Sequence, residues 1–319
     1  MRARSLGVVT LALAASVCSA PREAPAPEDH VNQLVSEARK LDLGGQQAAS
    51  IALYRQALAS APGSFDAHYG IARALDLAGS YDEARQHFAK ALELASDSEK
   101  EQTLRMMGIA WTFVGDVNEA SRYFTQAFDR RVAEKNPAAA ADIANELGRV
   151  YLELGVTDQA EKWYRTGHEM SHRAKDQLAW QIDLADMRWA HAQARIAARR
   201  GRQEEARRQE AIVKTLLDKG GNDDQRIQYA YLRGYVDFYF DDFRGAVDAL
   251  AQADQKDPAV LILLGEACDK LGRRDEAREY YRQVVQSSSH AVNSAFARPL
   301  ARRKLADYNG STQFKEGPA

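Results

Sequence analysis

One motif recurs along nearly the whole chain: a small residue, a large residue four positions later, and a second small residue three beyond that. The strongest copies are Ser50-Tyr54-Ala57, Ala84-Phe88-Ala91, Ala120-Phe124-Ala127 and Ala160-Tyr164-Gly167. Weaker copies are Ala206-Glu210-Val213, Ala246-Leu250-Ala253 and Ala277-Tyr281-Val284. The copies start 34, 36, 40, 46, 40 and 31 residues apart, a spacing typical of stacked repeats. The sequence therefore predicts an array of repeated units with a long shared core.

Small residues at fixed positions indicate that each unit is a pair of antiparallel helices. A further small residue stands twelve positions before each copy, namely Ala38, Ala72, Gly108, Gly148, Ala194, Gly234 and Gly265. Only small side chains let two helix backbones approach closely at a crossing, and larger neighbours fill the space around it. No stretch of the sequence shows the sustained alternation of a half-buried strand. We therefore predict an all-α fold.

The order of residues within the units resembles the tetratricopeptide repeat. The first unit carries the pattern as Leu34, Ala38, Leu41, Gly45, Ser50, Tyr54, Ala57 and Pro62, and the fourth as Leu147, Gly148, Tyr151, Gly155, Ala160 and Tyr164. The resemblance implies a right-handed α-solenoid over residues 31–291, with about seven helix-turn-helix units at 31–64, 65–98, 101–134, 141–174, 187–220, 227–257 and 258–291. The fifth unit departs most, because Glu210 replaces the aromatic residue, and its first helix is predicted to be extended over 176–200.

The segment after the last unit predicts one more helix, at residues 292–308. Pro299 is tolerated if it lies in the first turn of that helix. Ala301, Leu305 and Tyr308 recur at helical spacing and are expected to face inward, with Arg302 and Arg303 outward. Such a polar-faced helix suits the cap of an open stack. Residues 309–319 are predicted to form a flexible tail.

The N-terminus has the layout of a secretory signal at residues 1–19. Two arginines precede a largely apolar run at 7–17, which is too short to span a membrane. Cys18 stands where a bacterial lipoprotein carries its acylated cysteine, while ordinary cleavage after Ser19 or Ala20 is the alternative. A Pro-rich linker is predicted at 20–30. We therefore expect export to the periplasm, with or without a lipid anchor. Cys268, the other cysteine, is expected to be a buried apolar residue.

One catalytic signature occurs, at His168-Glu169-Met170-Ser171-His172. Two His at i and i+4 beside a Glu match the zinc-protease pattern, because both imidazoles share one helix face. Lys175 and Leu178 stand where one zincin class has its Gly and third His, and the repeat already accounts for the helix. We therefore interpret the match as an exposed helix end. With no Gly-rich phosphate loop or nucleophile elbow, we expect no enzymatic activity, metal or other cofactor.

The inner wall of the solenoid carries the clearer functional signal. In the resembling family the concave surface comes mainly from the first helix of each unit. The inward positions of this chain give Arg39, Tyr69, Arg73, Arg105, Asn145, Arg149, His191, Arg195, Tyr231 and Tyr235. Arg forks grip carboxylates bidentately, and Tyr rings accept apolar or Pro-rich segments. The pattern favours a groove for an extended, acidic or carboxylate-bearing peptide. The alternative is a solvated Arg-rich face paired with neighbouring carboxylates.

These observations favour a binding or assembly module of the bacterial envelope. The formal net charge of −2 gives no support for general nucleic-acid binding. The expected partner is a protein or peptide, and membrane contact is expected only through a lipid anchor. A structural lipoprotein scaffold that self-associates, through the long helix near 176–200, is the first alternative. A zinc peptidase acting through residues 168–172 is the second.

Overall fold

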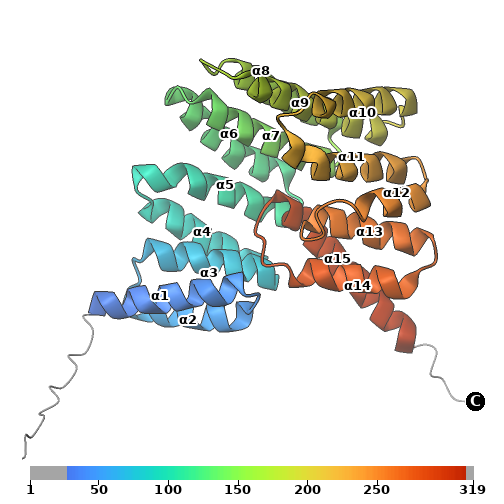
Figure 1. Cartoon of the computed structure of the whole chain (residues 1–319). Coiled ribbons are helices and arrows are strands. Elements are labelled where there is room, and N and C mark those ends of the chain that lie inside the picture. Colours follow the sequence, from blue (N-terminus) through green and yellow to red (C-terminus); the bar gives the residue numbers. More distant parts are fainter. Residues whose placement is uncertain (1–26, 314–319) are drawn as a thin grey trace, which may run out of the picture.

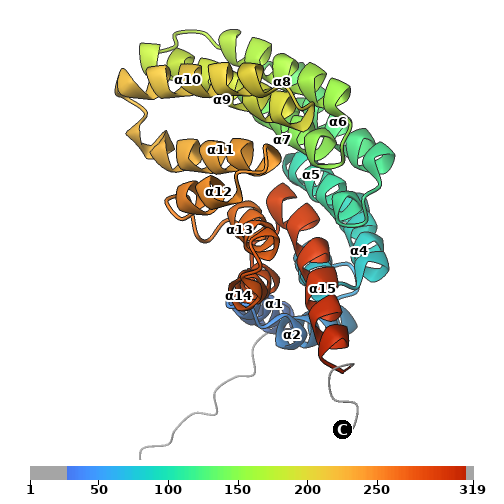
Figure 2. The ribbon, with the colours of Figure 1, turned by 90° about the vertical axis from the view of Figure 1, so that its right-hand side faces the viewer.

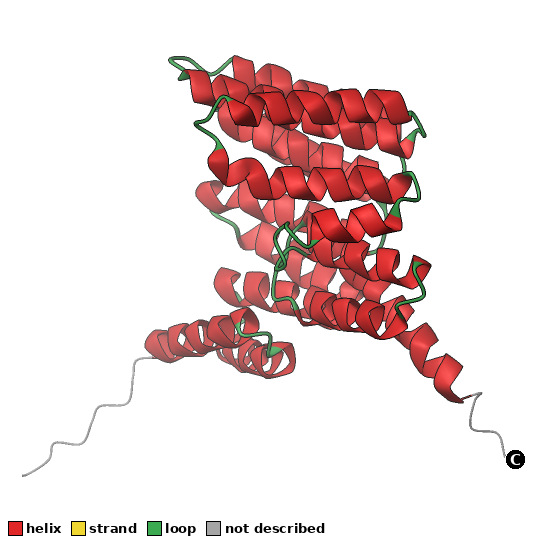
Figure 3. Ribbon diagram, turned by 45° about the vertical axis from the view of Figure 1, so that its right-hand side comes forward, coloured by secondary structure: helices red, strands yellow, loops and turns green. Residues whose placement is uncertain are grey.

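The computed structural model describes residues 27–313, all of which belong to helices or the short connections between them. Seven helix pairs follow one another, α1 (Pro27–Leu43) with α2 (Gln47–Ser60), α3 (Phe65–Ala78) with α4 (Tyr81–Leu94), α5 (Asp97–Phe113) with α6 (Val117–Ala133), α7 (Pro137–Glu153) with α8 (Thr157–His172), α9 (Ala179–Arg199) with α10 (Gln203–Asp218), α11 (Arg226–Tyr239) with α12 (Phe243–Leu250), and α13 (Pro258–Lys270) with α14 (Arg274–Gln286). The 3₁₀ helix η1 (Asp223–Gln225) precedes α11, and α15 (Val292–Gln313) ends the described chain. Figure 3 shows this all-helical architecture, which confirms the predicted α-solenoid.

Local sequence signals explain where many helices begin. The Asp116 carboxylate caps α6 by accepting hydrogen bonds from the backbone N–H groups of Asn118 and Glu119, each at 3.1 Å. Asn136 caps α7 in the same way, and Pro137 follows at a position where its missing N–H is not needed. At the other end of a helix, Gly79 closes α3 with a φ of 93°, a left-handed conformation that side chains with a Cβ rarely adopt.

The small residues of the repeat lie against its large residues, as the sequence predicts. A Cβ placed on Gly108 would come within 2.6 Å of the Phe124 ring, and one on Gly265 within 2.5 Å of Tyr281. Phe124 and Tyr281 have no exposed surface. Units three and seven therefore close around an aromatic side chain that packs directly on the backbone of its partner helix.

The solenoid curves until its two ends meet. Figures 1 and 2 show α1–α8 rising along one side and α9–α14 returning along the other. The turn after α1 reaches the end of α14, since a Cβ on Gly45 would lie 3.5 Å from the carbonyl oxygen of Gln286. The described chain is thus a closed ring of helix pairs with an interior.

Helix α15 occupies that interior, so it does more than cap the last unit as the sequence predicts. It packs on α13 and α14 but also on α5 and α7, across the ring (Figure 2). Val292 and Ala295 belong to the same buried cluster as Leu104 and Leu147. Pro299 therefore lies inside the helix and not in its first turn.

Two further expectations for α15 need correction. Ala301 is buried and Leu305 packs on the core, as predicted, but Arg302 does not face outward. Its guanidinium donates a hydrogen bond of 2.8 Å to the carbonyl oxygen of Leu77. The reason is that α15 has protein on two sides, so only part of its circumference, including Arg303, is exposed. The helix also continues to Gln313, into the predicted tail.

Some helices begin earlier than the repeat spacing indicates. Helices α5 and α7 start four residues before their predicted units, and α9 starts eight residues before residue 187. Helix α1 starts at Pro27, inside the predicted linker, because Pro is compatible with a first turn and Glu28 and Asp29 suit the positive helix end.

The second cysteine is buried, as predicted: Cys268 has no exposed surface and forms no disulfide within residues 27–313. None of the helices in the described residues has the length and apolar character required to cross a bilayer. The predicted signal and Cys18 lie outside these residues.

Candidate functional site

A cavity of about 660 Å³ opens on the inner wall where units three to six face the start of α15. Five of the ten predicted groove residues line it, namely Arg105, Asn145, Arg149, His191 and Arg195. They come from α5, α7 and α9, the first helices of three successive units. The segment Ala291–Asn293 forms its remaining side, so α15 narrows the predicted open groove into a pocket.

Most of the positive charge in this cavity is already paired within the chain. Arg105 makes a bidentate contact with Glu146, at 2.9 and 2.6 Å, and lies 3.6 Å from Glu101. Arg188, a residue that the sequence analysis did not single out, lies 3.4 Å from Asp142. These pairs match the alternative interpretation, in which inward arginines bridge neighbouring repeats.

Arg195 differs because it has no carboxylate partner among the described residues. Its side chain donates one hydrogen bond, of 2.9 Å, to the Tyr164 hydroxyl, and its Nε and Nη1 atoms make none. The residue is only 5% exposed. A buried guanidinium with unused donors is unfavourable unless an anion or water completes its hydrogen bonds. Arg195 is among the residues that line the cavity.

The environment of His191 is consistent with a site that favours negative charge. Burial and the neighbouring cations Arg195 and Arg149 hold the pKa of His191 well below its ordinary value. The ring stacks on Tyr231 with 6.0 Å between the ring centres, and its Nε2 lies 3.3 Å from the carbonyl oxygen of Gln228. His191 is therefore neutral near pH 7 and adds a polar group to the cavity without adding positive charge.

Three predicted groove residues contact other parts of the chain instead of remaining free for a ligand, namely Arg149, Tyr231 and Tyr235. Arg149 donates a hydrogen bond of 2.6 Å to the Tyr231 hydroxyl, and its Nε lies 2.9 Å from Glu153. Its guanidinium also lies over the Phe296 ring of α15. Tyr231 and Tyr235 are nearly fully buried and therefore offer little surface to a ligand in an open groove. The physical reason is that α15 fills the space that the sequence analysis leaves to solvent.

A second cavity, of about 450 Å³, lies beside the first part of α15. Tyr231 and Tyr235 reach its wall together with Arg199, Glu153 and Glu266. Arg199 donates to Glu153 at 2.9 Å and to the Tyr235 hydroxyl at 2.9 Å. Arg199 thus has both a carboxylate and a hydroxyl partner, whereas Arg195 lacks a carboxylate partner among the described residues.

The three remaining groove residues lie in units one and two, away from both cavities. Arg39 is 58% exposed and contacts Asp66 at 3.2 Å. Arg73 lies 3.9 Å from the buried Asp42, and Tyr69 accepts a hydrogen bond from Gln102. None of these three residues lines either cavity.

The His168–His172 segment ends α8, as the repeat predicts. The sequence has no third ligand at the expected downstream positions, but the structure shows one from another helix. Asp186 of α9 places a carboxylate oxygen 2.8 Å from the Nε2 of His168 and 2.9 Å from that of His172. Sequence spacing could not reveal this contact, because it depends on how α9 packs on α8.

Helical spacing could have revealed two of the missed arginines. Arg188, Arg195 and Arg199 are seven and four residues apart on α9, so they share a face with His191. One inward position per repeat gives only part of this stripe, because α9 is longer than the first helix of a standard unit.

Comparison with known proteins agrees with the repeat architecture. A tetratricopeptide repeat model matches residues 44–99 and 113–167, and another matches residues 258–290. No curated protein sequence matches the chain. Among solved structures, the apo form of RapI is 13% identical with a TM-score of 0.56, covering 87% of this chain and 99% of its own. A tetratricopeptide repeat protein from Parabacteroides merdae is 13% identical with a TM-score of 0.51, covering 87% and 98%.

A kinesin light chain repeat structure from Podospora anserina is also similar, at 16% identity and a TM-score of 0.51, covering 62% of this chain and all of its own. At such identities the likeness concerns the fold alone. The repeat matches lie at both ends of the ring, and the helix pairs between them continue the same packing. The chain belongs to the tetratricopeptide repeat family.

Proposed function

We propose that the chain is an exported protein-binding module whose concave cavity holds a carboxylate-bearing segment of a partner. The observation that carries the proposal is Arg195, a buried cation that lines a cavity of about 660 Å³ and has two nitrogen donors without a hydrogen-bond partner. A carboxylate would accept both donors and neutralise the charge, as Arg–carboxylate forks do.

The surroundings define the rest of the ligand. Asn145 offers amide donors and acceptors, and Met187 and Val213 offer apolar surface. The carboxylates of Glu146 and Asp142 are already paired with arginines, so they repel an anionic ligand less than free carboxylates would. A short peptide end or an acidic side chain with one apolar neighbour suits this lining.

The test begins with capture of the partner in cells. A photocrosslinking amino acid replaces Asn145 in the full chain, and the crosslinked segments are identified by mass spectrometry. A synthetic peptide of the captured segment is then titrated against wild type, Arg195→Gln and the control Arg165→Gln. Arg165 pairs with Glu161 on the exposed side of α8.

We expect Arg195→Gln to weaken binding by roughly 10- to 150-fold, the range for a lost charge-assisted hydrogen bond. Blocking the carboxylate of the peptide as an amide should weaken binding to wild type and have little effect on the variant. Equal affinity of all three proteins for the captured peptide would refute the proposed site.

Self-association is the second candidate, and one surface favours it. Leu178, Trp180 and Ile182 are exposed at the start of α9, within the segment proposed for assembly. Three large apolar side chains on neighbouring residues are unusual on a monomeric surface. Sedimentation of wild type and Trp180→Asp would decide: a dimer that dissociates in the variant supports self-association, and a monomeric wild type excludes it.

The proposal includes export, on the strength of the signal pattern at residues 1–19. The family is generally non-enzymatic, and we propose that this chain is too. Hydrolysis through the 168–172 motif would require Glu169 to act as a base. A peptidase activity that wild type shows and Glu169→Gln lacks would contradict a purely binding function.

A further inference from the structure

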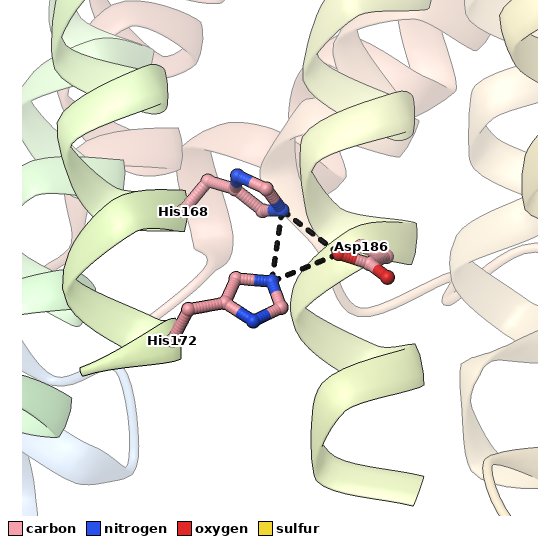
Figure 4. Close-up of side chains that lie close together, drawn as sticks. All are labelled: His168, His172 and Asp186. Carbon is pink, nitrogen blue, oxygen red and sulfur yellow. Dashed lines mark hydrogen bonds and ion pairs between the residues drawn. The ribbon is translucent and has the colours of Figure 1, made fainter. Parts of the chain in front are cut away.

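Three metal-ligand side chains converge where unit four meets unit five. Figure 4 shows His168 and His172 on α8 directing their Nε2 atoms toward Asp186 on α9. The two Nε2 atoms are 3.1 Å apart, and each lies within 2.9 Å of the same carboxylate oxygen. Among the residues that the structure describes, this is the single cluster of three His, Cys, Asp or Glu whose ligand atoms come so close.

The helices hold these groups in place for separate reasons. His168 and His172 are four residues apart, so one turn of α8 stacks them on the same face. Asp186 lies in the part of α9 that precedes the predicted repeat, which runs beside the end of α8. Trp189, one turn further along α9, stacks on the His168 ring at 5.8 Å and restricts its orientation. The cluster is therefore built by two helices and does not depend on the loop between them.

The arrangement fits a small divalent ion. Zinc binds imidazole nitrogen and carboxylate oxygen at about 2.0–2.1 Å. With the three atoms 2.8–3.1 Å apart, a point at that distance from all of them lies about 1 Å outside their plane. Two imidazoles and one carboxylate suit zinc and its neighbours in the transition series better than magnesium or calcium, which prefer oxygen ligands.

We propose that His168, His172 and Asp186 form a binding site for a divalent transition ion of the zinc type, which clamps α8 to α9. The side chains are 25%, 36% and 42% exposed, so an ion can enter from solvent and retains a coordination position there. Three protein ligands leave a fourth position for water or for a group of a partner. The site is separate from Arg195 and does not depend on the proposed peptide cavity.

Metal binding to the full chain, freed of metal by chelation, tests the proposal directly. Zinc is titrated against the protein in competition with a chromophoric chelator, and the melting temperature is measured with and without zinc. We expect one zinc per chain and a rise in melting temperature, because the ion binds the folded junction and not the unfolded chain. Magnesium at the same concentration should produce neither effect.

Three variants assign the ligands. His168→Ala, His172→Ala and Asp186→Asn should each weaken zinc binding by roughly tenfold or more, since even groups that only orient a ligand contribute that much. Glu169→Gln should bind zinc like wild type, because its side chain belongs to no ligand set. His87→Ala is the matched control: His87 also lies beside a second histidine, His68, at 2.8 Å between the Nδ1 atoms, but without a third ligand atom in a comparable cluster.

The variants also separate a clamp from a fold defect. Metal-free His172→Ala should have the helicity and melting temperature of metal-free wild type, and should lose only the increment that zinc adds. The proposal is wrong if wild type binds less than one zinc per chain in the titration. It is equally wrong if the three ligand variants bind zinc as tightly as His87→Ala does.

Discussion

The buried side chains of His290 and Asp76 meet at 2.8 Å, although 214 residues separate them in sequence. Asp76 lies on α3, in the second unit, and His290 lies just before α15. Two aromatic rings, Phe88 and Phe113, flank the imidazole with ring centres 5.8 and 5.4 Å away. The pair therefore joins the early units to the end of the chain in a site that excludes water.

Removing either member of this pair should destabilise the protein. Asp76→Ala and His290→Ala should each lower the free energy of unfolding by about 3–5 kcal/mol, because the remaining group stays buried without its partner. The double variant should cost clearly less than the sum of the two. Urea unfolding of the four proteins measures this coupling. The exposed pair Arg55 and Glu83 is the control, with an expected coupling below about 1 kcal/mol, and strictly additive effects at His290 and Asp76 would contradict the pairing.

Gly265→Ala should destabilise the last unit. Its new methyl group would lie 2.5 Å from the buried Tyr281 ring, so the ring or the helix must move, at a cost of about 1–3 kcal/mol. Gly63→Ala is the matched control, since no atom lies within 4 Å of a Cβ there. Thermal unfolding should separate the two variants, and equal melting temperatures would argue against the helix crossing at Gly265.

Arg195 and Arg105 should respond differently to neutralisation. Arg195→Met removes a buried charge that lacks a carboxylate partner, so the free energy of unfolding should stay equal or rise. Arg105→Met leaves Glu146 without its bidentate partner and should lower the free energy of unfolding by roughly 1–3 kcal/mol. Urea denaturation at neutral pH compares them. A large loss in Arg195→Met would mean that the guanidinium serves the fold and not a ligand.

The low pKa of His191 predicts that acid weakens the fold. Burial, Arg195 and Arg149 depress the folded-state pKa, so the unfolded chain binds a proton first as the pH falls below about 6.5. The contribution of the neutral His191 side chain to the free energy of unfolding is fully present above that pH. It is lost as the pH falls toward the lower pKa of the folded state. The free energy of unfolding of His191→Gln should therefore fall less than that of wild type between pH 7.5 and 5.5. Unfolding free energies that fall in parallel would exclude this role.

If the chain is exported as we propose, Cys18 decides between a lipid anchor and a free periplasmic protein. If the cysteine is acylated, Cys18→Ser should move the protein from the membrane fraction to the soluble envelope fraction. The mature chain should lack at least residues 1–17 in either case, which mass spectrometry of the N-terminus shows. A soluble wild type that begins at Ala20 or Pro21 would exclude the anchor.

Local patterns were enough to predict the repeats but not the interior of the ring. Gly108 and Phe124 belong to one unit, so their contact follows from helical spacing. The position of α15 depends instead on the accumulated curvature of seven units, which brings Leu77 within reach of Arg302. The same limit applies to the site: Arg195 is recognisable as inward from its position, but its lack of a carboxylate partner depends on which acids the neighbouring arginines already bind.

The passage of α15 through the ring has a consequence for how the protein comes apart. In an open repeat array each unit contacts only its neighbours, so fraying starts at an end and unzips the stack in steps. Here Arg302 and His290 fasten the C-terminal segment to α3, and Val292 and Ala295 share a core with units three and four. The C-terminal segment therefore cannot loosen without exposing the core of units three and four. We therefore expect the chain to unfold with the cooperativity of a globular domain, although its sequence is that of a linear array.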